Sequence, residues 1–365
     1  MPPLLENLMR PDLLDLRPYE GIDPPEVLAA RLGIPPERIV KLDGNENPYG
    51  PSPAVCQALG SYAGYHIYPD PLQRRLRSAL ASYAGVQPDQ VVAGAGSDEL
   101  IDLLLRLFLS PGDKVIDLSP SFGMYPFCTK VNGGIVVDVP RDAAWEIDPS
   151  AVRRAVDKRT KVVFVANPNN PTGNLTPIEV VLDLAETGIL VVVDETYHEF
   201  CGFTAVPWLA HYENLVILRT LSKWAGLAGL RLGYGIMSPR IVQRVLAIKA
   251  PYNISVAAEL AALASLEDTD TLLQRVRTLV EERERMAHAL RAIGGVVVYP
   301  SKTNFLLVHL PGHRGDAVAA ALARRGVLVR TFSHPRLVEC VRISVGLPHH
   351  TDALVSAMRS ILGGK

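Results

Sequence analysis

The sequence predicts an α/β protein in which a large domain, with a mostly parallel sheet sandwiched by helices, is followed by a smaller α+β domain. Between Val91 and Ile248, short runs rich in β-branched residues alternate with longer amphipathic runs, a pattern typical of a parallel sheet covered on both faces. After about Asn253 a long helical stretch comes first and short strand-like runs follow it, which is the order of an α+β unit.

The first forty residues are expected to form an extended arm. They contain eight prolines, and the six from Pro11 to Pro36 separate short apolar pieces. Each proline removes a hydrogen-bond donor and restricts the residue before it. Only Pro25–Leu32 is expected to be helical, with proline at its first turn. We therefore divide the chain into an N-terminal arm that joins the small domain (1–40), a large domain (41–253) and a small C-terminal domain (254–365).

The remaining elements follow from hydrophobic periodicity. The expected strands of the large domain are Val91–Ala93, Lys114–Leu118, Gly134–Val139, Lys161–Ala166, Ile189–Val193, Leu215–Leu218 and Leu232–Ile236. The expected helices between them are Asp98–Leu109, Pro149–Val156, Pro177–Glu186 and Arg240–Ile248. In the small domain one helix is expected over Val256–Ala292, followed by strands at Val296–Tyr299, Asn304–His309, Val327–Arg330 and Val341–Val345.

Charge and cysteine content exclude several classes of protein. With 37 Lys and Arg against 38 Asp and Glu, the chain lacks the positive charge of a general nucleic-acid binder. The four cysteines lie far apart, which argues against a disulfide scaffold or a zinc site, so no metal is expected. The N-terminus carries acids within its apolar run and no apolar stretch reaches about 18 residues, so neither a signal peptide nor a membrane contact is expected. We expect a cytoplasmic enzyme.

Two short segments resemble nucleotide-binding motifs but lack their key residues. In Val91–Glu99 a glycine turn leads into a helix, yet Glu99 stands where a dinucleotide fingerprint has its third glycine. Gly96, Ser97 and Asp98 still form a helix N-terminus that suits a phosphate, although an ordinary capped turn explains them as well. The strand that ends at Asp194 resembles that of an ATPase, but the chain has no phosphate loop to go with it.

Asp194 and Lys223 are candidates for a shared site. Asp194 follows a buried strand at the edge where parallel sheets bind ligands, and a buried carboxylate requires a cation; a helix cap is the alternative. Lys223 lies between hydroxyl residues and a glycine-rich apolar loop, where lost hydration lowers an amine's pKa and permits Schiff-base formation. Arg231 offers a cationic fork for a phosphate. Asn167 ends another strand in a rigid Pro- and Asn-rich turn.

Taken together, these motifs resemble the fold-type I pyridoxal-phosphate enzymes, the aspartate-aminotransferase superfamily, from about Leu42 to Val345. The resemblance implies that Lys223 holds pyridoxal 5'-phosphate as a Schiff base and shuttles a proton, and that Asp194 keeps the pyridine nitrogen protonated. It further implies that Tyr197 and Asn167 bond the ring's phenolic oxygen and that Phe122 stacks on the ring. The phosphate would be held by Gly96, Ser97, Asp98, Ser222 and Arg231.

Four stretches resemble one subgroup, the histidinol-phosphate aminotransferase family: Arg17–Tyr19, Leu42–Pro48, Tyr68–Asp70 and Val341–Gly346. The resemblance implies a homodimer in which Tyr68 reaches the neighbouring subunit's cofactor phosphate. It also implies that Arg342, aided by Arg330 and Tyr19, binds the anionic end of the substrate, with Asn167 lining the substrate site. Two exposed strand cations are the alternative interpretation of Arg330 and Arg342.

The expected reaction is transamination of L-histidinol phosphate with 2-oxoglutarate, giving imidazole acetol-phosphate and L-glutamate in histidine biosynthesis. Two alternatives use the same site: an aromatic-amino-acid aminotransferase and an O-phosphothreonine decarboxylase. Release of carbon dioxide would mark the decarboxylase, whereas formation of glutamate would mark a transferase. A cofactor-free binding protein on the same scaffold is a third alternative, and it would leave Lys223 unmodified.

Overall fold

The computed structural model describes residues 5–19 and 21–363 and contains a seven-stranded sheet and two smaller sheets in that part of the chain. The large sheet has the strand order β2-β8-β7-β6-β5-β3-β4. The strands β4, β3, β5, β6 and β7 are parallel to one another. Strand β8 runs antiparallel to both β7 and β2. The prediction of a mostly parallel sheet is therefore confirmed.

The strand bounds in the large sheet lie within two residues of those expected. They are β2 (Val91–Gly94), β3 (Lys114–Asp117), β4 (Ile135–Asp138), β5 (Thr160–Ala166), β6 (Leu190–Asp194), β7 (Leu215–Thr220) and β8 (Gly233–Met237). The helices around this sheet are α3 (Pro53–Ser61), α4 (Arg74–Ala84), α5 (Ser97–Phe108), α6 (Met124–Val131), α7 (Pro149–Ala155), α8 (Ile178–Ala185), α9 (His198–Cys201), α10 (Pro239–Ile248) and α11 (Val256–Glu267).

Helices cover both faces of the large sheet, because alternate residues of each strand point to opposite sides. In β6, Val191 and Val193 pack in one core with α7 and α8. Leu190 and Val192 pack in a second core with α5, α6 and α10. All five residues of β6 are buried, which explains why the strand has a continuous apolar sequence rather than an alternating one.

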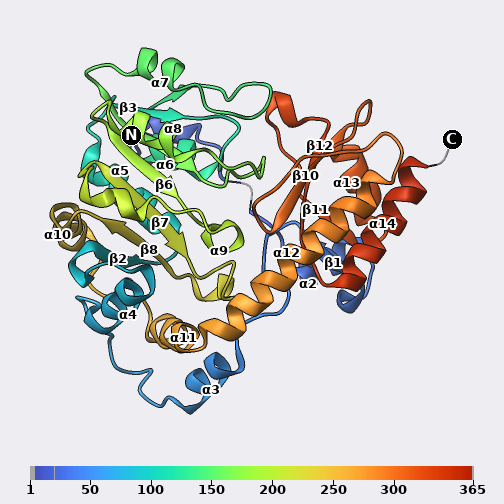
Figure 1. The fold of residues 1–365 in the computed structure, drawn as a ribbon, viewed down its shortest axis with the longest axis horizontal. Helices are drawn as coiled ribbons and strands as arrows, with labels where there is room; N and C mark the ends of the chain where they lie inside the picture. The colour runs from blue at the N-terminus through green and yellow to red at the C-terminus, as the bar shows by residue number, and fades with distance from the viewer. Residues whose placement is uncertain (1–4, 20, 364–365) are drawn as a thin grey trace.

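The second part of the molecule is built on a three-stranded antiparallel sheet, β12-β10-β9 (Figure 1). A parallel pair, β1 with β11, adds an early segment of the chain to this part. The strands are β1 (Val40–Leu42), β9 (Val297–Val298), β10 (Phe305–His309), β11 (Val327–Val329) and β12 (Cys340–Ser344). The helices are α12 (Thr269–Arg291), α13 (Gly315–Ala323) and α14 (Pro348–Leu362).

The single helix expected over Val256–Ala292 is wrong. The structure ends α11 at Glu267 and begins α12 at Thr269, with Asp268 between them outside helical geometry at φ −113° and ψ 36°. The sequence at the break is Asp-Thr-Asp-Thr, and such residues favour caps over helix interiors because their side chains compete for backbone hydrogen bonds. The break lets α11 pack on α3 and α4 while α12 runs to the second part of the molecule (Figure 1).

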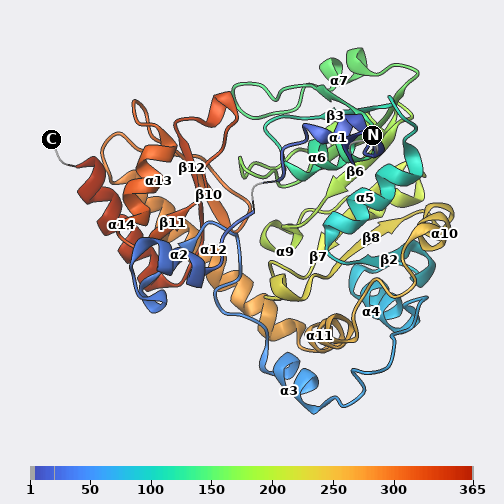
Figure 2. The same ribbon diagram turned by 180° about the vertical axis from the view of Figure 1, so that it is seen from behind.

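The described residues of the N-terminal forty contact both parts of the molecule. Helix α1 (Pro11–Leu14) lies beside α6 on the large sheet, and the Arg10 guanidinium donates a 2.9 Å hydrogen bond to the carbonyl of Val131. Helix α2 (Pro25–Leu32), which has the expected bounds, lies instead with the second part of the molecule (Figure 2). The chain thus crosses from one part to the other between these two helices.

The carboxyl ends of β5, β6 and β7 meet at one edge of the large sheet. Ala166 pairs with Asp194, and Asp194 pairs with Leu218, so the loops after these strands begin side by side. Parallel α/β sheets bind ligands at this edge. Among the described helices, none is long and apolar enough to cross a membrane.

Candidate active site

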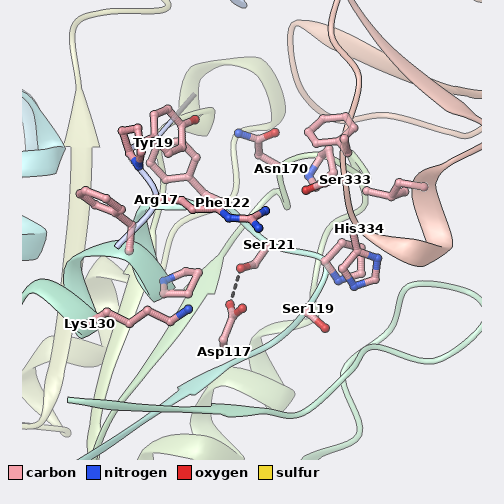
Figure 3. Close-up of a pocket in the computed structure, with 18 of the residues that line it drawn as sticks. Arg17, Tyr19, Asp117, Ser119, Ser121, Phe122, Lys130, Asn170, Ser333 and His334 are labelled. Atoms are coloured by element: carbon pink, nitrogen blue, oxygen red, sulfur yellow. Dashed lines mark hydrogen bonds between the residues drawn. The ribbon is translucent and has the colours of Figure 1, made fainter. Parts of the chain in front are cut away.

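Two cavities open where this edge of the large sheet faces the second part of the molecule. The inner cavity has a volume of about 200 Å³ and the outer cavity about 1100 Å³. Five residues line both cavities: Tyr19, Ile22, Phe122, Asn170 and Arg342. Figure 3 shows the outer cavity, with Arg17 and Phe122 above the pair formed by Ser121 and Asp117.

Lys223 lies in the inner cavity, shortly after β7 ends. Its Nζ donates a 3.1 Å hydrogen bond to the carbonyl of Gly44, which comes from the loop after β1. Burial, with the nearby cation of Arg342 as the second cause, lowers the pKa of the Lys223 amine to about 8. An amine with this pKa is half neutral near pH 8, and its neutral form can attack an aldehyde.

Asp194 lies at the end of β6 with its carboxylate buried in the same cavity. One oxygen accepts a 2.7 Å bond from the Tyr125 hydroxyl, and the other accepts bonds from the Thr196 hydroxyl at 2.6 Å and backbone N–H at 3.1 Å. Burial raises the pKa of Asp194. The site therefore favours a protonated nitrogen as a partner that would offset the cost of burying this charge.

Two hydrogen bonds, which pass through Asn45, connect Tyr197 to the second part of the molecule. Its hydroxyl accepts a 2.9 Å bond from Asn45 Nδ2, and the Asn45 backbone N–H donates to the Ser344 hydroxyl at 2.8 Å. Burial raises the pKa of Tyr197 to about 12, so the phenol stays protonated and can donate. A phenol supported in this way can donate to an oxygen in the inner cavity.

Four of the residues that the sequence suggests for a phosphate lie together near the N-terminus of α5, and we call this group the cradle. Ser97, Asp98, Ser222 and Arg231 line the inner cavity, together with Thr220, which was not predicted. A Cβ on Gly96, which has φ 80°, would lie 2.3 Å from Arg231 Nη2. The φ of Gly96 favours glycine, because a side chain is strained in that conformation, and the missing Cβ also lets the guanidinium approach the helix N-terminus closely. Arg231 Nη2 also donates a 3.0 Å hydrogen bond to Asp98.

The prediction for Asn167 is wrong. Its Nδ2 donates to the carbonyl of Thr176 at 2.9 Å and its Oδ1 accepts from the Thr176 N–H at 2.8 Å, so its amide closes the loop on itself. Asn170 lines both cavities instead, and its Oδ1 accepts a 2.8 Å bond from Arg342 Nη1. The sequence signal that points to Asn170 is the second Asn-Pro step, directly before Thr172 and Gly173.

Arg342 lines both cavities, and Arg330 lines the outer one. Arg342 is buried on β12, and its Nη2 donates a 2.6 Å bond to the carbonyl of Asp43. Its Nε is buried without a hydrogen-bond partner in the described structure, so the guanidinium retains a donor for a ligand. Arg330 lines the outer cavity and lies next to Arg342, because the backbones of the two residues pair.

Two aromatic side chains line both cavities and one lies outside them. Phe122 packs edge-on against Tyr125 with ring centroids 5.5 Å apart, and Tyr19 packs edge-on against Phe122 at 6.4 Å. Tyr68 lines neither cavity of its own chain. Its side chain is 77% exposed and stacks on Tyr252 with centroids 4.4 Å apart.

The sequence analysis missed three further polar side chains that line the inner cavity: Asn45, Tyr125 and Thr196. Thr196 carries a local signal, because a threonine two positions after an aspartate can bond its carboxylate. The Tyr125 bond to Asp194 spans 69 positions, and the Asn45 bond to Tyr197 spans 152. Contacts over such separations follow from the folded topology and carry no local pattern.

The donor set of the inner cavity fits pyridoxal 5'-phosphate. The cradle that only glycine permits at position 96 suits the phosphate, and buried Asp194 suits a protonated ring nitrogen. Tyr197 suits the phenolic oxygen and the Lys223 amine suits the aldehyde. The fold and this site define a fold-type I enzyme that depends on pyridoxal phosphate.

The chain belongs to the class I and II aminotransferase family, whose model matches residues 37–359. A histidinol-phosphate aminotransferase of Roseiflexus castenholzii is 47% identical over 99% of this chain and 100% of the relative. A chloroplastic histidinol-phosphate aminotransferase of Nicotiana tabacum is 45% identical over 97% of this chain and 86% of its own length. The crystal structure of histidinol-phosphate aminotransferase from Sinorhizobium meliloti in complex with pyridoxal-5'-phosphate is 28% identical, with a TM-score of 0.86 over 94% of this chain and 96% of that one.

Proposed function

We propose that this enzyme transfers the amino group of L-histidinol phosphate to 2-oxoglutarate, giving imidazole acetol-phosphate and L-glutamate in histidine biosynthesis. The observation that carries the proposal is the buried guanidinium of Arg342 in the wall shared by the two cavities, next to Arg330. Two guanidinium groups complement a phosphate dianion, and the same pair accepts the carboxylate of glutamate. The relatives that match the whole chain carry the name of this activity.

In this proposal the chain's own residues divide the work of positioning and proton transfer. Pyridoxal phosphate supplies an aldehyde that condenses with amino groups and a ring that accepts electrons. Lys223 would be the attachment point, and its Nζ, as a neutral amine, would carry a proton between the substrate carbon and the cofactor carbon. Asp194 holds the ring nitrogen in its protonated form, with Tyr125 and Thr196 fixing the carboxylate.

Further residues hold the cofactor at its edges. Tyr197, which accepts a hydrogen bond from Asn45, would bond the phenolic oxygen. Asn170, rather than Asn167, is the asparagine that lines the cavity and could also bond this oxygen. Phe122 would stack on the ring face. The α5 N-terminus, Ser222 and Arg231 would hold the phosphate, and Tyr19, which packs edge-on against Phe122, would contact the substrate.

We also propose a homodimer located in the cytoplasm. Tyr68 is exposed and lies outside both cavities of its own chain, so it can complete a site only in a second copy. All four cysteines are free thiols, as suits a reducing compartment. The arm (1–40), large domain (41–253) and small domain (254–365) remain our proposed division of the chain.

A half-reaction tests the proposed substrate. Cofactor-loaded protein is mixed with L-histidinol phosphate, phenylalanine or O-phosphothreonine without a keto acid, and the absorbance of the bound cofactor is followed. We expect only histidinol phosphate to convert the cofactor rapidly to its amine form. Faster conversion by phenylalanine would assign an aromatic-amino-acid aminotransferase, and release of carbon dioxide from phosphothreonine would assign the decarboxylase. The relatives favour neither alternative.

A further inference from the structure

The two arginines of the proposed anion site lie at the base of one loop. The Arg330 N–H donates to the Arg342 carbonyl at 3.0 Å, and the Arg342 N–H donates back to the Arg330 carbonyl at 2.8 Å. These two bonds close the segment 331–339, between β11 and β12, into a loop, which we call the arginine loop. Five of its residues line the outer cavity: Thr331, Phe332, Ser333, His334 and Leu337. The position of this loop therefore sets both the cavity wall and the arginine pair.

The tip of the arginine loop is fastened to the other part of the molecule by Arg336. Its guanidinium carbon lies 4.2 Å from the ring centroid of Trp145, in the turn after β4. Its two terminal nitrogens donate hydrogen bonds to the backbone carbonyls of Arg141 and Asp142 in the same turn. A planar guanidinium can stack on a ring and bond two carbonyls at once, which a lysine cannot do.

Trp145 is held firmly enough to serve as the anchor. It has φ 67°, a left-handed conformation that a bulky residue adopts only when its surroundings impose it. Its carbonyl accepts bonds from Arg141 Nη1 at 3.0 Å and Asn174 Nδ2 at 2.9 Å.

The Trp145 ring is almost fully buried, although it belongs to a turn of the large sheet. It packs with Leu307, Leu337 and Cys340 of the second part of the molecule and lies edge-on to Tyr299, with centroids 5.9 Å apart. The side chain therefore inserts from one part of the molecule into the other, directly beneath the arginine loop.

We propose that Arg336 and Trp145 are positioning residues that fix the arginine loop, so that Arg330 and Arg342 meet the anionic end of the substrate. The loop is pinned at its base by the paired backbones and at its tip by Arg336, so it cannot swing away from the outer cavity. Figure 3 shows the wall it forms, with Ser333 and His334 across the cavity from Asp117 and Ser121. This inference rests on the proposed function, in which the two arginines bind substrate.

Arg336→Gln tests the proposal. Loss of the stacked cation and its two hydrogen bonds should raise KM for both histidinol phosphate and 2-oxoglutarate by roughly tenfold. kcat should stay within about twofold, and the absorbance of the bound cofactor should not change, because the inner cavity is not touched. Arg336→Lys keeps a cation over Trp145 and should recover part of the loss. Arg314→Gln, which removes an exposed arginine paired with Asp316 in the same part of the molecule, should leave all values at wild type.

Two outcomes would overturn the positioning role. One is an unchanged KM in Arg336→Gln, and the other is a fall in kcat and in cofactor binding as large as the rise in KM. Arg342→Ala separates this inference from the proposed function. If Arg342→Ala leaves KM unchanged, the assignment of the anion site is wrong; if it raises KM and Arg336→Gln does not, only the positioning role fails.

Discussion

The surroundings of Lys223 lower the pKa of its amine, and this has a measurable consequence. Burial lowers its pKa from 10.5 to about 8, and the cation of Arg342 contributes to the shift. Because only the neutral amine attacks an aldehyde, the rate at which apo-enzyme captures pyridoxal phosphate should rise with pH and level off above about pH 8. Stopped-flow absorbance measures this rate.

Two variants control the measurement on Lys223. Arg342→Met removes the neighbouring cation and should move the midpoint to higher pH, whereas Lys223→Ala should fold with an unchanged melting temperature and show no turnover. A rate that keeps rising to pH 10.5, the ordinary pKa of a lysine, would refute the lowered pKa.

Asn167 and Asn170 differ in function although they lie three positions apart. Asn167 makes two buried hydrogen bonds to the Thr176 backbone, so Asn167→Ala should lower the free energy of unfolding by about 2 kcal/mol and change KM little. Asn170→Ala removes an acceptor from Arg342, so it should raise KM for both substrates roughly tenfold with little effect on stability. Urea unfolding measures the free energy of unfolding of both variants, and steady-state kinetics measures their KM values. The reverse pattern would show that Asn167 faces the substrate after all.

At the scale of the residue, sequence analysis succeeded where the position of a side chain follows from a strand end. Asp194 and Lys223 were found because parallel strands end at one edge, and both line the inner cavity. The prediction failed for Asn167 because three asparagines, Asn167, Asn169 and Asn170, lie in one turn. Only the hydrogen bonds of the folded chain, such as those from Asn167 to Thr176, show which amide faces the cavity. Asn45 could not be found, since its neighbours Tyr197 and Ser344 are brought to it by the fold.

At the scale of the element, the junction between β2 and α5 limits which residue can occupy position 96 in the cradle. Gly96 has φ 80°, and a Cβ there would lie 2.3 Å from Arg231 Nη2. Gly96→Ala should therefore displace the guanidinium and weaken pyridoxal-phosphate binding about tenfold or more. Titration of the apo-enzyme by absorbance measures the affinity. Gly229→Ala is the control, because a Cβ at that position meets nothing within 4 Å. If the two variants bind pyridoxal phosphate with equal affinity, the cradle does not bind the phosphate.

The elements themselves were predictable to different degrees. The strands of the large sheet are continuous apolar runs between glycines and prolines, so their bounds came within two residues. The break between α11 and α12 was missed because the apolar pattern continues across Asp268 while the local Asp and Thr residues favour a cap. The arm was expected to join the small domain, yet α1 lies on α6, because Arg10 and its neighbours contact residues more than a hundred positions away.

At the scale of the whole molecule, the site depends on groups brought together from both parts. The inner cavity is lined by Asp194 from the end of β6, Lys223 from the loop after β7, Asn45 from the segment after β1, and Arg342 from β12. The bond from Asn304 Nδ2 to the Asn45 carbonyl, 2.9 Å long, ties that segment to the small sheet. Movement of one part against the other would therefore separate the cofactor residues from the substrate arginines. Pinning the arginine loop to Trp145 opposes that movement.

The proposed homodimer makes the site shared between two chains, and hybrid dimers test this. Tyr68 is exposed and stacked on Tyr252 outside both cavities, so in a dimer it would serve the site that contains the partner's lysine. Tyr68→Ala should therefore be inactive at limiting pyridoxal phosphate, and Lys223→Ala inactive at any concentration. When the two variants are unfolded together and refolded, half of the dimers are hybrids, and each hybrid contains one native site. Activity should then return to about one quarter of wild type, since closed twofold symmetry gives two sites per dimer. An activity equal to the mean of the two variants would show that Tyr68 acts within its own chain or not at all.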